Sequence, residues 1–196
     1  MQRRKWASTS NCSQRKHDIS GSKNRQCDAT VNSEFTSLIE RLLTELKAAC
    51  LEVYGESLVS LAVFGSVGRG TPRPDSDVDL LIVANGLPTG RLRRMEGFRA
   101  VEDALQRVSA QFQSQGLNLI LSPVIRLPTE ITAGSPLLLD LVDDARVLYD
   151  PNNFLSNALA DLRRRLDALH ARRVWAGNAW WWDLKPDYKP GEVFTI

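Results

Sequence analysis

Hydrophobic residues alternate along this chain between helical and strand spacing, beginning at Ser33. After Ser33, which suits the N-cap of a helix, apolar side chains recur three and four positions apart, as on one face of a helix: Phe35, Leu38, Ile39, Leu42, Leu43 and Leu46. Two apolar runs, residues 58–64 and 78–84, have the length and β-branched content of buried strands. A loop rich in glycine, proline and aspartate, residues 65–76, connects them.

The second half of the chain continues the same alternation. Residues 91–115 carry one apolar helical face, and Gly116 then ends the predicted helix. Pro123 interrupts the next strand and indicates an edge position or a bulge, because proline cannot donate a ladder hydrogen bond. The remaining predicted elements are that strand (117–127), a short helix (136–142), a short strand (146–149) and a helix (152–172). This order predicts an α/β (α+β) fold, a small mixed β-sheet flanked by helices.

Charge and composition divide the chain into segments. Residues 1–30 contain seven lysines and arginines against two aspartates, a balance of +5 (7 − 2), whereas the formal net charge of the whole chain is +2. The remainder is therefore mildly acidic. This polar leader has too few apolar groups to offset the entropy of ordering, so we expect it to be disordered. The prediction is a leader (1–30), a folded domain (33–150), and a C-terminal helix and tryptophan-rich tail that pack on this domain (151–196).

Composition excludes several classes of protein. With 196 residues, the chain has the size of one ordinary domain. No run approaches the roughly 20 apolar residues of a membrane-spanning helix, so no membrane association is expected. The three cysteines lack CxxC spacing, which argues against a disulfide framework and a zinc site. The leader has no apolar core of a secretory signal, and the predicted location is the cytoplasm.

The loop after the first strand has the composition of a phosphate-binding turn. Gly65, Gly68 and Gly70 allow the backbone N–H groups to approach an anion closely, and Ser66 adds a hydroxyl donor. Arg69 lies in the same loop and could clamp phosphates. The alternative is that the glycines only form a turn, since glycine and proline are common in loops.

Two aspartates follow this loop at the start of the second strand. Asp77 and Asp79 are two positions apart, and the strand period of two places both carboxylates on one face. Two like charges this close repel each other unless a cation lies between them. Carboxylate oxygens together with substrate phosphates suit Mg²⁺ or Mn²⁺. Asp75 lies just outside this pair of aspartates and is interpreted as a loop-capping or solvent-facing residue.

The combined stretch GSVGRGTPRPDSDVDLLIV resembles the G-S…D-x-D signature of the DNA polymerase β-like nucleotidyltransferase superfamily, in its minimal-domain branch. The resemblance covers about residues 35–125. It implies that Gly65 and Ser66 contact the triphosphate of a nucleoside triphosphate (NTP). It also implies that Asp77 and Asp79 are the catalytic metal ligands of a two-metal phosphoryl transfer.

One position departs from the pattern of the superfamily. Its members usually supply a third carboxylate from the strand after the long helix, and Asn118 occupies that position here. Asparagine can coordinate through its carbonyl oxygen but cannot act as a base. Glu130 or another acid is then expected to substitute, or the protein is a weak enzyme.

The C-terminal tail concentrates aromatic residues. Four of the five tryptophans lie within eight residues, beside basic side chains: Trp175, Trp180, Trp181 and Trp182. One interpretation is that the indoles staple the tail to the domain or to a partner. The other is that they stack a base while cations meet phosphate, with Lys185 as the side chain delivered to the nucleotide.

Two functions follow as hypotheses. The first is a Mg²⁺-dependent nucleotidyltransferase that moves NMP from an NTP to a hydroxyl of tRNA, of a protein or of a small molecule. The resemblance also implies a possible toxin or antitoxin partner. The second is a catalytically inactive nucleotide-binding module that acts as a regulatory subunit. Label transfer from NTP distinguishes the two.

Overall fold

The computed structural model describes residues 24–115, 117, 119–176 and 179–196, and side chains from residue 34 onward. The chain divides into two units, residues 1–36 and residues 37–196. In the first unit, the described residues belong to a helix. The second unit contains every strand of the structure and the helices that follow α1. Its elements, with the helix that enters it, are α1 (Asn24–Tyr54), a 3-10 turn (Gly55–Ser57), β1 (Leu58–Phe64), α2 (Gly65–Gly68), β2 (Val78–Ala84), α3 (Arg91–Ala104), α4 (Gln106–Ser114), β3 (Leu121–Arg126), α5 (Pro128–Thr132), α6 (Leu137–Asp144), β4 (Arg146–Tyr149), α7 (Phe154–Ala168), β5 (Arg172–Ala176) and β6 (Ala179–Asp183).

A four-stranded mixed sheet forms the centre of the second unit. Its strand order is β3-β2-β1-β4, with β1 antiparallel to both β2 and β4, and β2 parallel to β3. The predicted mixed sheet flanked by helices is therefore confirmed. The edge position indicated by Pro123 is also confirmed, because β3 is an outer strand.

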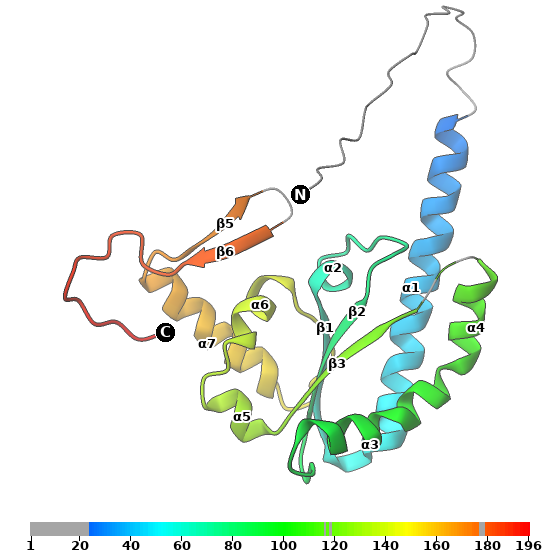
Figure 1. Cartoon of the computed structure of the whole chain (residues 1–196), viewed down its shortest axis with the longest axis horizontal. Coiled ribbons are helices and arrows are strands. Elements are labelled where there is room, and N and C mark those ends of the chain that lie inside the picture. The colour runs from blue at the N-terminus through cyan, green and yellow to red at the C-terminus, as the bar shows by residue number, and fades with distance from the viewer. Residues whose placement is uncertain (1–23, 116, 118, 177–178) are drawn as a thin grey trace, which may run out of the picture. The chain divides into compact units, whose positions relative to one another are not determined.

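The two faces of the sheet are covered by different helices. In Figure 1, α5, α6 and α7 lie on one side of the sheet, and α3, α4 and the second half of α1 lie on the other. Alternating residues of β1 and β2 supply the core beneath α5–α7. That core contains Ala62, Phe64, Leu81, Val83, Ile131, Leu138, Leu141, Leu155, Leu162 and Leu166. Asp77 and Asp79 share the alternation of Leu81 and Val83, so their side chains belong to the face that α6 covers.

Several predicted boundaries differ from the observed ones. Helix α1 begins at Asn24 and not at Ser33, so residues 24–30, expected in a disordered leader, are helical. The physical reason is that no glycine or proline interrupts residues 22–54. The remainder of the leader, residues 1–23, lies outside the described residues. The single helix predicted over residues 91–115 is instead two helices, α3 and α4, separated at Leu105.

The tail contains a second, two-stranded sheet that the sequence analysis did not predict. β5 and β6 pair antiparallel, with Trp175 opposite Trp180. The dipeptide Gly177-Asn178, a common hairpin connection, was the overlooked signal in the sequence. Within the part of the chain that the structure describes, no helix is long and apolar enough to cross a bilayer.

Candidate active site

The turn that follows β1 lies directly against the first residues of β2. Phe64, the last residue of β1, is paired with Asp79 across the antiparallel ladder. Gly65 then starts the single turn α2 with φ of +65°, in the left-handed region. A Cβ atom added to Gly65 would lie 2.5 Å from Oδ2 of Asp79. A side chain at this position would have to adopt a strained backbone conformation and displace the carboxylate of Asp79, so glycine is favoured here and the turn approaches that carboxylate closely.

The rest of the turn is fixed by backbone hydrogen bonds and by close packing. The N–H of Arg69 donates to the carbonyl of Gly65 at 3.1 Å, and the N–H of Thr71 donates to that of Ser66 at 2.9 Å. Gly68 packs so tightly on the end of α6 that an added Cβ would overlap the carbonyl oxygen of Asp144. The turn is thus held from both sides, by β2 and by α6.

Asp77 and Asp79 lie where the strand pattern predicted. Val78 and Leu80 are buried in the core between and after them, whereas Asp77 is exposed and Asp79 is half-buried. Burial and then the charge of Asp77 raise the pKa of Asp79 above its ordinary 3.8, although a hydrogen bond from Ser122 and the charge of Arg69 act in the opposite direction. The ionised pair is therefore electrostatically unfavourable in the protein alone, which is the condition that a bound cation relieves.

The neighbouring strand supplies no acid at the position beside Asp79. The parallel register of β2 and β3 pairs Asp79 with Ser122. Asn118, which the sequence analysis placed at the third-acid position, lies outside the described residues. Glu130 is engaged elsewhere, in an ion pair with Arg94 at 2.7 Å. Among the described residues, no group of three or more His, Cys, Asp or Glu side chains is arranged to hold a metal ion.

One acid that sequence reasoning missed lies on α6. The charge of Asp140 raises the pKa of Asp79, and burial raises the pKa of Asp140 itself. Asp140 and Asp144 are four residues apart, and therefore on one face of the short apolar helix LLLDLVDD. That spacing was the available signal in the sequence.

Asp144 connects the turn to the C-terminal tail. Its side chain is 4% exposed and accepts bonds from Arg69 of the turn and from Arg173 of β5. Arg173 is bidentate, with its two terminal nitrogens 2.6 and 3.0 Å from the two carboxylate oxygens. Burial acts to raise the pKa of Asp144, but the hydrogen bonds from Arg173 and Arg69 outweigh it and hold that pKa below 3.8.

The tryptophans of the tail have different environments. The guanidinium carbon of Arg173 lies 3.7 Å from the ring centroid of Trp180 and 4.8 Å from that of Trp175. Trp182 donates from its indole nitrogen to the carbonyl of Leu139 on α6 at 3.0 Å and packs against the core. The contacts of Trp182 support the stapling interpretation for that residue. The contacts of Trp180 with Arg173 and Trp175 lie within the hairpin itself, and Trp175 and Trp181 are about half exposed.

Lys185, the predicted nucleotide contact of the tail, is engaged by acids of the same segment. Its ammonium nitrogen is 3.5 Å from carboxylate oxygens of both Asp187 and Glu192. The basic side chain of the C-terminal segment that reaches the turn, through Asp144, is that of Arg173. The sequence-based role of Lys185 stays a prediction.

Two sequence comparisons show which protein family has these features. The model of the nucleotidyltransferase domain family matches residues 43–118, which include the Gly-Ser turn and both aspartates. A protein of Methanocaldococcus jannaschii, named "Putative protein adenylyltransferase MJ1305", is 30% identical over 128 residues, or 64% of this chain and 82% of that protein. This chain belongs to the nucleotidyltransferase family. The family predicted from the G-S…D-x-D motif is thereby confirmed, and with it an enzyme whose substrate is an NTP.

Solved structures with a similar fold include two nucleotide complexes. One is the spectinomycin adenyltransferase of Enterococcus faecialis with ATP and spectinomycin, with a TM-score of 0.47 and 14% identity over 67% of this nucleotidyltransferase and 66% of that chain. Another is a toxin-antitoxin structure with AMP-PNP, with a TM-score of 0.39 and 15% identity over 65% and 92%. At these values, neither likeness says anything of the substrate or partner of this nucleotidyltransferase.

Proposed function

We propose that this nucleotidyltransferase transfers AMP from ATP to a hydroxyl group of a protein. The contact between Gly65 and Asp79 carries the chemical part of the proposal, because it joins a phosphate-binding turn to two carboxylates within one small region. The similarity to the M. jannaschii protein supports the choice of ATP as donor and of a protein as acceptor.

The turn and the two aspartates have separate roles in this reaction. Gly65, Ser66 and Arg69 bind the triphosphate, through backbone N–H groups, a hydroxyl and a guanidinium. Asp77 and Asp79 are the catalytic metal ligands. Two hard carboxylates suit Mg²⁺ or Mn²⁺, because Mg²⁺ is usually bound through one or two carboxylates and completes its shell with substrate phosphates and water. When bound, the ion neutralises phosphate charge and lowers the pKa of the acceptor hydroxyl.

The bond changes are those of a simple displacement. The acceptor oxygen forms a bond to the α-phosphorus of ATP, and the bond from that phosphorus to the oxygen bridging to the β-phosphorus breaks. Pyrophosphate leaves, and the proton of the hydroxyl passes to water. The protein contributes mainly by positioning and charge neutralisation, as is usual in phosphoryl transfer.

The proposal is tested with ATP labelled at the α-phosphate, Mg²⁺ and cell extract, alongside labelled CTP, GTP and UTP. We expect label from ATP in material that protease removes and ribonuclease leaves intact. The variant Asp77→Asn/Asp79→Asn should lose transfer, whereas Asp75→Asn, an exposed acid of the same loop, should keep it. Label on RNA or on a small molecule would contradict a protein acceptor. Retained NTP binding without any transfer would instead favour the inactive nucleotide-binding module.

The identity of the protein acceptor is a separate matter. The minimal-domain resemblance of the sequence favours a toxin or an antitoxin as the partner. Co-expression with the product of the adjacent gene, followed by the same labelling, tests this. Label on an unrelated protein in place of that product would contradict the partner while leaving protein adenylylation intact.

A further inference from the structure

A cavity of about 290 Å³ lies at the edge of the main sheet, between the start of α3 and the outer strand β3. It begins at Pro123, one residue after the strand partner of Asp79, and extends along β3 away from the two aspartates. Ser122 is paired with Asp79 at the start of β3, and the cavity extends to Arg126 at the other end of the strand. Arg126 is four positions further along the strand than Ser122, so the arginine end of the cavity is about 13 Å from that residue. The volume is close to the lower end of the usual range for small-molecule sites, about 300 Å³.

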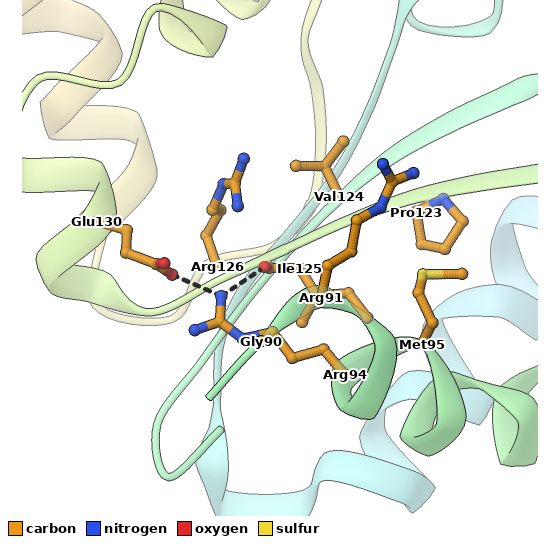
Figure 2. A pocket seen from close by; sticks show the side chains of 9 residues that line it. All are labelled: Gly90, Arg91, Arg94, Met95, Pro123, Val124, Ile125, Arg126 and Glu130. Carbon is orange, nitrogen blue, oxygen red and sulfur yellow. Dashed lines mark hydrogen bonds and ion pairs between the residues drawn. The ribbon is translucent and has the colours of Figure 1, made fainter. Parts of the chain in front are cut away.

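Three arginines line this cavity, and one of them is fixed (Figure 2). The side chain of Arg94 is 10% exposed. Its Nε donates to the carbonyl of Pro88 at 3.0 Å, and one terminal nitrogen donates to the carbonyl of Ile125 at 3.0 Å and to Glu130 at 2.7 Å. Arg94 is therefore part of the wall, and it covers a carbonyl on the outer edge of the sheet.

Glu130 is the acidic residue that lines the cavity, and its carboxylate is paired with Arg94. The oxygen that accepts from Arg94 also accepts from the backbone N–H of Leu127 at 2.6 Å. The bond from Arg94, followed by that from Leu127, holds the pKa of Glu130 below its ordinary 4.5. Glu130 therefore stays ionised and oriented toward Arg94.

The other two arginines have no such partner. Within the part of the chain that the structure describes, the side chains of Arg91 and Arg126 form no salt bridge or hydrogen bond. In Figure 2 their guanidinium groups extend on either side of Val124 and point the same way, whereas Arg94 turns toward Glu130. Three guanidinium charges against one carboxylate leave the cavity with an excess of two positive charges (3 − 1).

We propose that this cavity is a second binding site, specific for a doubly charged phosphoryl group. Guanidinium groups bind phosphate oxygens in bidentate geometry. A phosphate monoester at neutral pH carries nearly two negative charges, which would balance the two excess positive charges of the cavity. Met95, Pro123 and Val124 form an apolar wall beside the arginines, which gives room for an organic group attached to the phosphate. The ligand is either free phosphate or a small phosphate monoester. This site is independent of the proposed transfer reaction.

The test uses the full chain without divalent metal, titrated with inorganic phosphate and with phenyl phosphate and followed by amide chemical shifts. We expect shifts at residues 90–95 and 123–126. Tighter binding of phenyl phosphate would identify a monoester as the ligand, and equal binding would identify free phosphate. Arg91→Gln/Arg126→Gln should weaken binding at least about tenfold. The unfolding temperature of this variant should stay close to that of the native protein, because neither side chain forms a salt bridge or a hydrogen bond among the described residues, and the charge of Arg126 is the weakest of the causes that lower the pKa of Glu130.

The matched control is Arg93→Gln. Arg93 is an exposed arginine of the same helix that does not line the cavity, and its replacement should leave the affinity unchanged. Three outcomes would overturn the proposal. They are equal weakening by Arg93→Gln, shifts confined to residues 65–70, and no shift up to about 10 mM phenyl phosphate, which corresponds to no useful affinity.

Discussion

Arg173 holds the buried carboxylate of Asp144 with both of its terminal nitrogens, at 2.6 and 3.0 Å, and so attaches the tail to the helix beside the active site. Asp144 also accepts a hydrogen bond from Arg69 of the Gly-Ser turn. A buried carboxylate that loses its counter-charge is strongly destabilising. In the proposed role of Arg69, its guanidinium turns toward a phosphate, and Arg173 then keeps the carboxylate of Asp144 compensated.

Replacing Arg173 should therefore affect both stability and substrate binding. We expect Arg173→Ala to lower the free energy of unfolding by on the order of 2–3 kcal/mol. We also expect the KM for ATP to rise, because Asp144 would then retain Arg69 alone. Arg172→Ala is the control: its side chain is 68% exposed, and its surface ion pair with Asp183 contributes less than about 1 kcal/mol. Equal losses in urea unfolding of the two variants would contradict the role given to Arg173.

The close approach of Gly65 to Asp79 makes a second prediction, with a control inside the same loop. Gly65 and Gly70 both have positive φ, +65° and +73°, but only Gly65 has an atom of Asp79 where a Cβ would lie. Gly70→Ala should cost about 1 kcal/mol of stability from backbone strain and keep transfer activity. Gly65→Ala should reduce kcat/KM about 100-fold or more, because it displaces the carboxylate. Similar activities of the two variants would show that this contact does not matter.

The raised pKa of Asp79 predicts that this side chain lowers the stability of the folded protein at neutral pH. Because burial and Asp77 raise the folded pKa above 3.8, the folded protein binds this proton at a higher pH than the unfolded chain does. Ionised Asp79 therefore costs stability at neutral pH. Without divalent metal at pH 7, Asp79→Asn should unfold at a higher temperature than the native protein, although we expect it to lose transfer. The difference in unfolding temperature should shrink as the pH falls below 3.8, the ordinary pKa of an aspartate, because Asp79 is then protonated in both the folded and the unfolded protein.

The control for this experiment is Asp75→Asn, which removes an exposed carboxyl group from the same loop. Its effect on the unfolding temperature should be small, since surface substitutions usually change stability by less than about 0.5 kcal/mol. A stabilised Asp75→Asn together with an unchanged Asp79→Asn would mean that net charge, and not burial of Asp79, determines the result.

Local patterns in the sequence predicted the parts of the site that local structure determines. The strands on both sides of the loop follow from continuous apolar runs, and the shared face of Asp77 and Asp79 follows from the period of a strand. Pro123 indicated the edge strand, because a central strand needs every backbone donor. Each of these features depends on residues within about ten positions of one another.

Contacts between distant segments could not be predicted in the same way. Asp144 meets Arg69 across 75 positions and Arg173 across 29, and no periodicity in one segment encodes its partner in another. The register that pairs Asp79 with Ser122 is likewise set by packing of the sheet. Local patterns therefore indicate the G-S…D-x-D motif, but they do not indicate Asp140, Asp144 and Arg173.

Arg69 and Lys185, the two basic side chains predicted to meet the nucleotide, now have different expected effects. Arg69 lies in the turn itself. Arg69→Gln should raise the KM for ATP about tenfold, because the variant loses one charge-assisted hydrogen bond to the nucleotide. The charge of Lys185 is shared with Asp187 and Glu192, so Lys185→Gln should change that KM less than about twofold, within the range of a surface substitution. Steady-state kinetics of the two variants against ATP, at fixed acceptor, make the comparison. If Lys185→Gln raises the KM as much as Arg69→Gln does, the tail lysine reaches the nucleotide as the sequence predicted, and its pairing with the two acids must open when ATP binds.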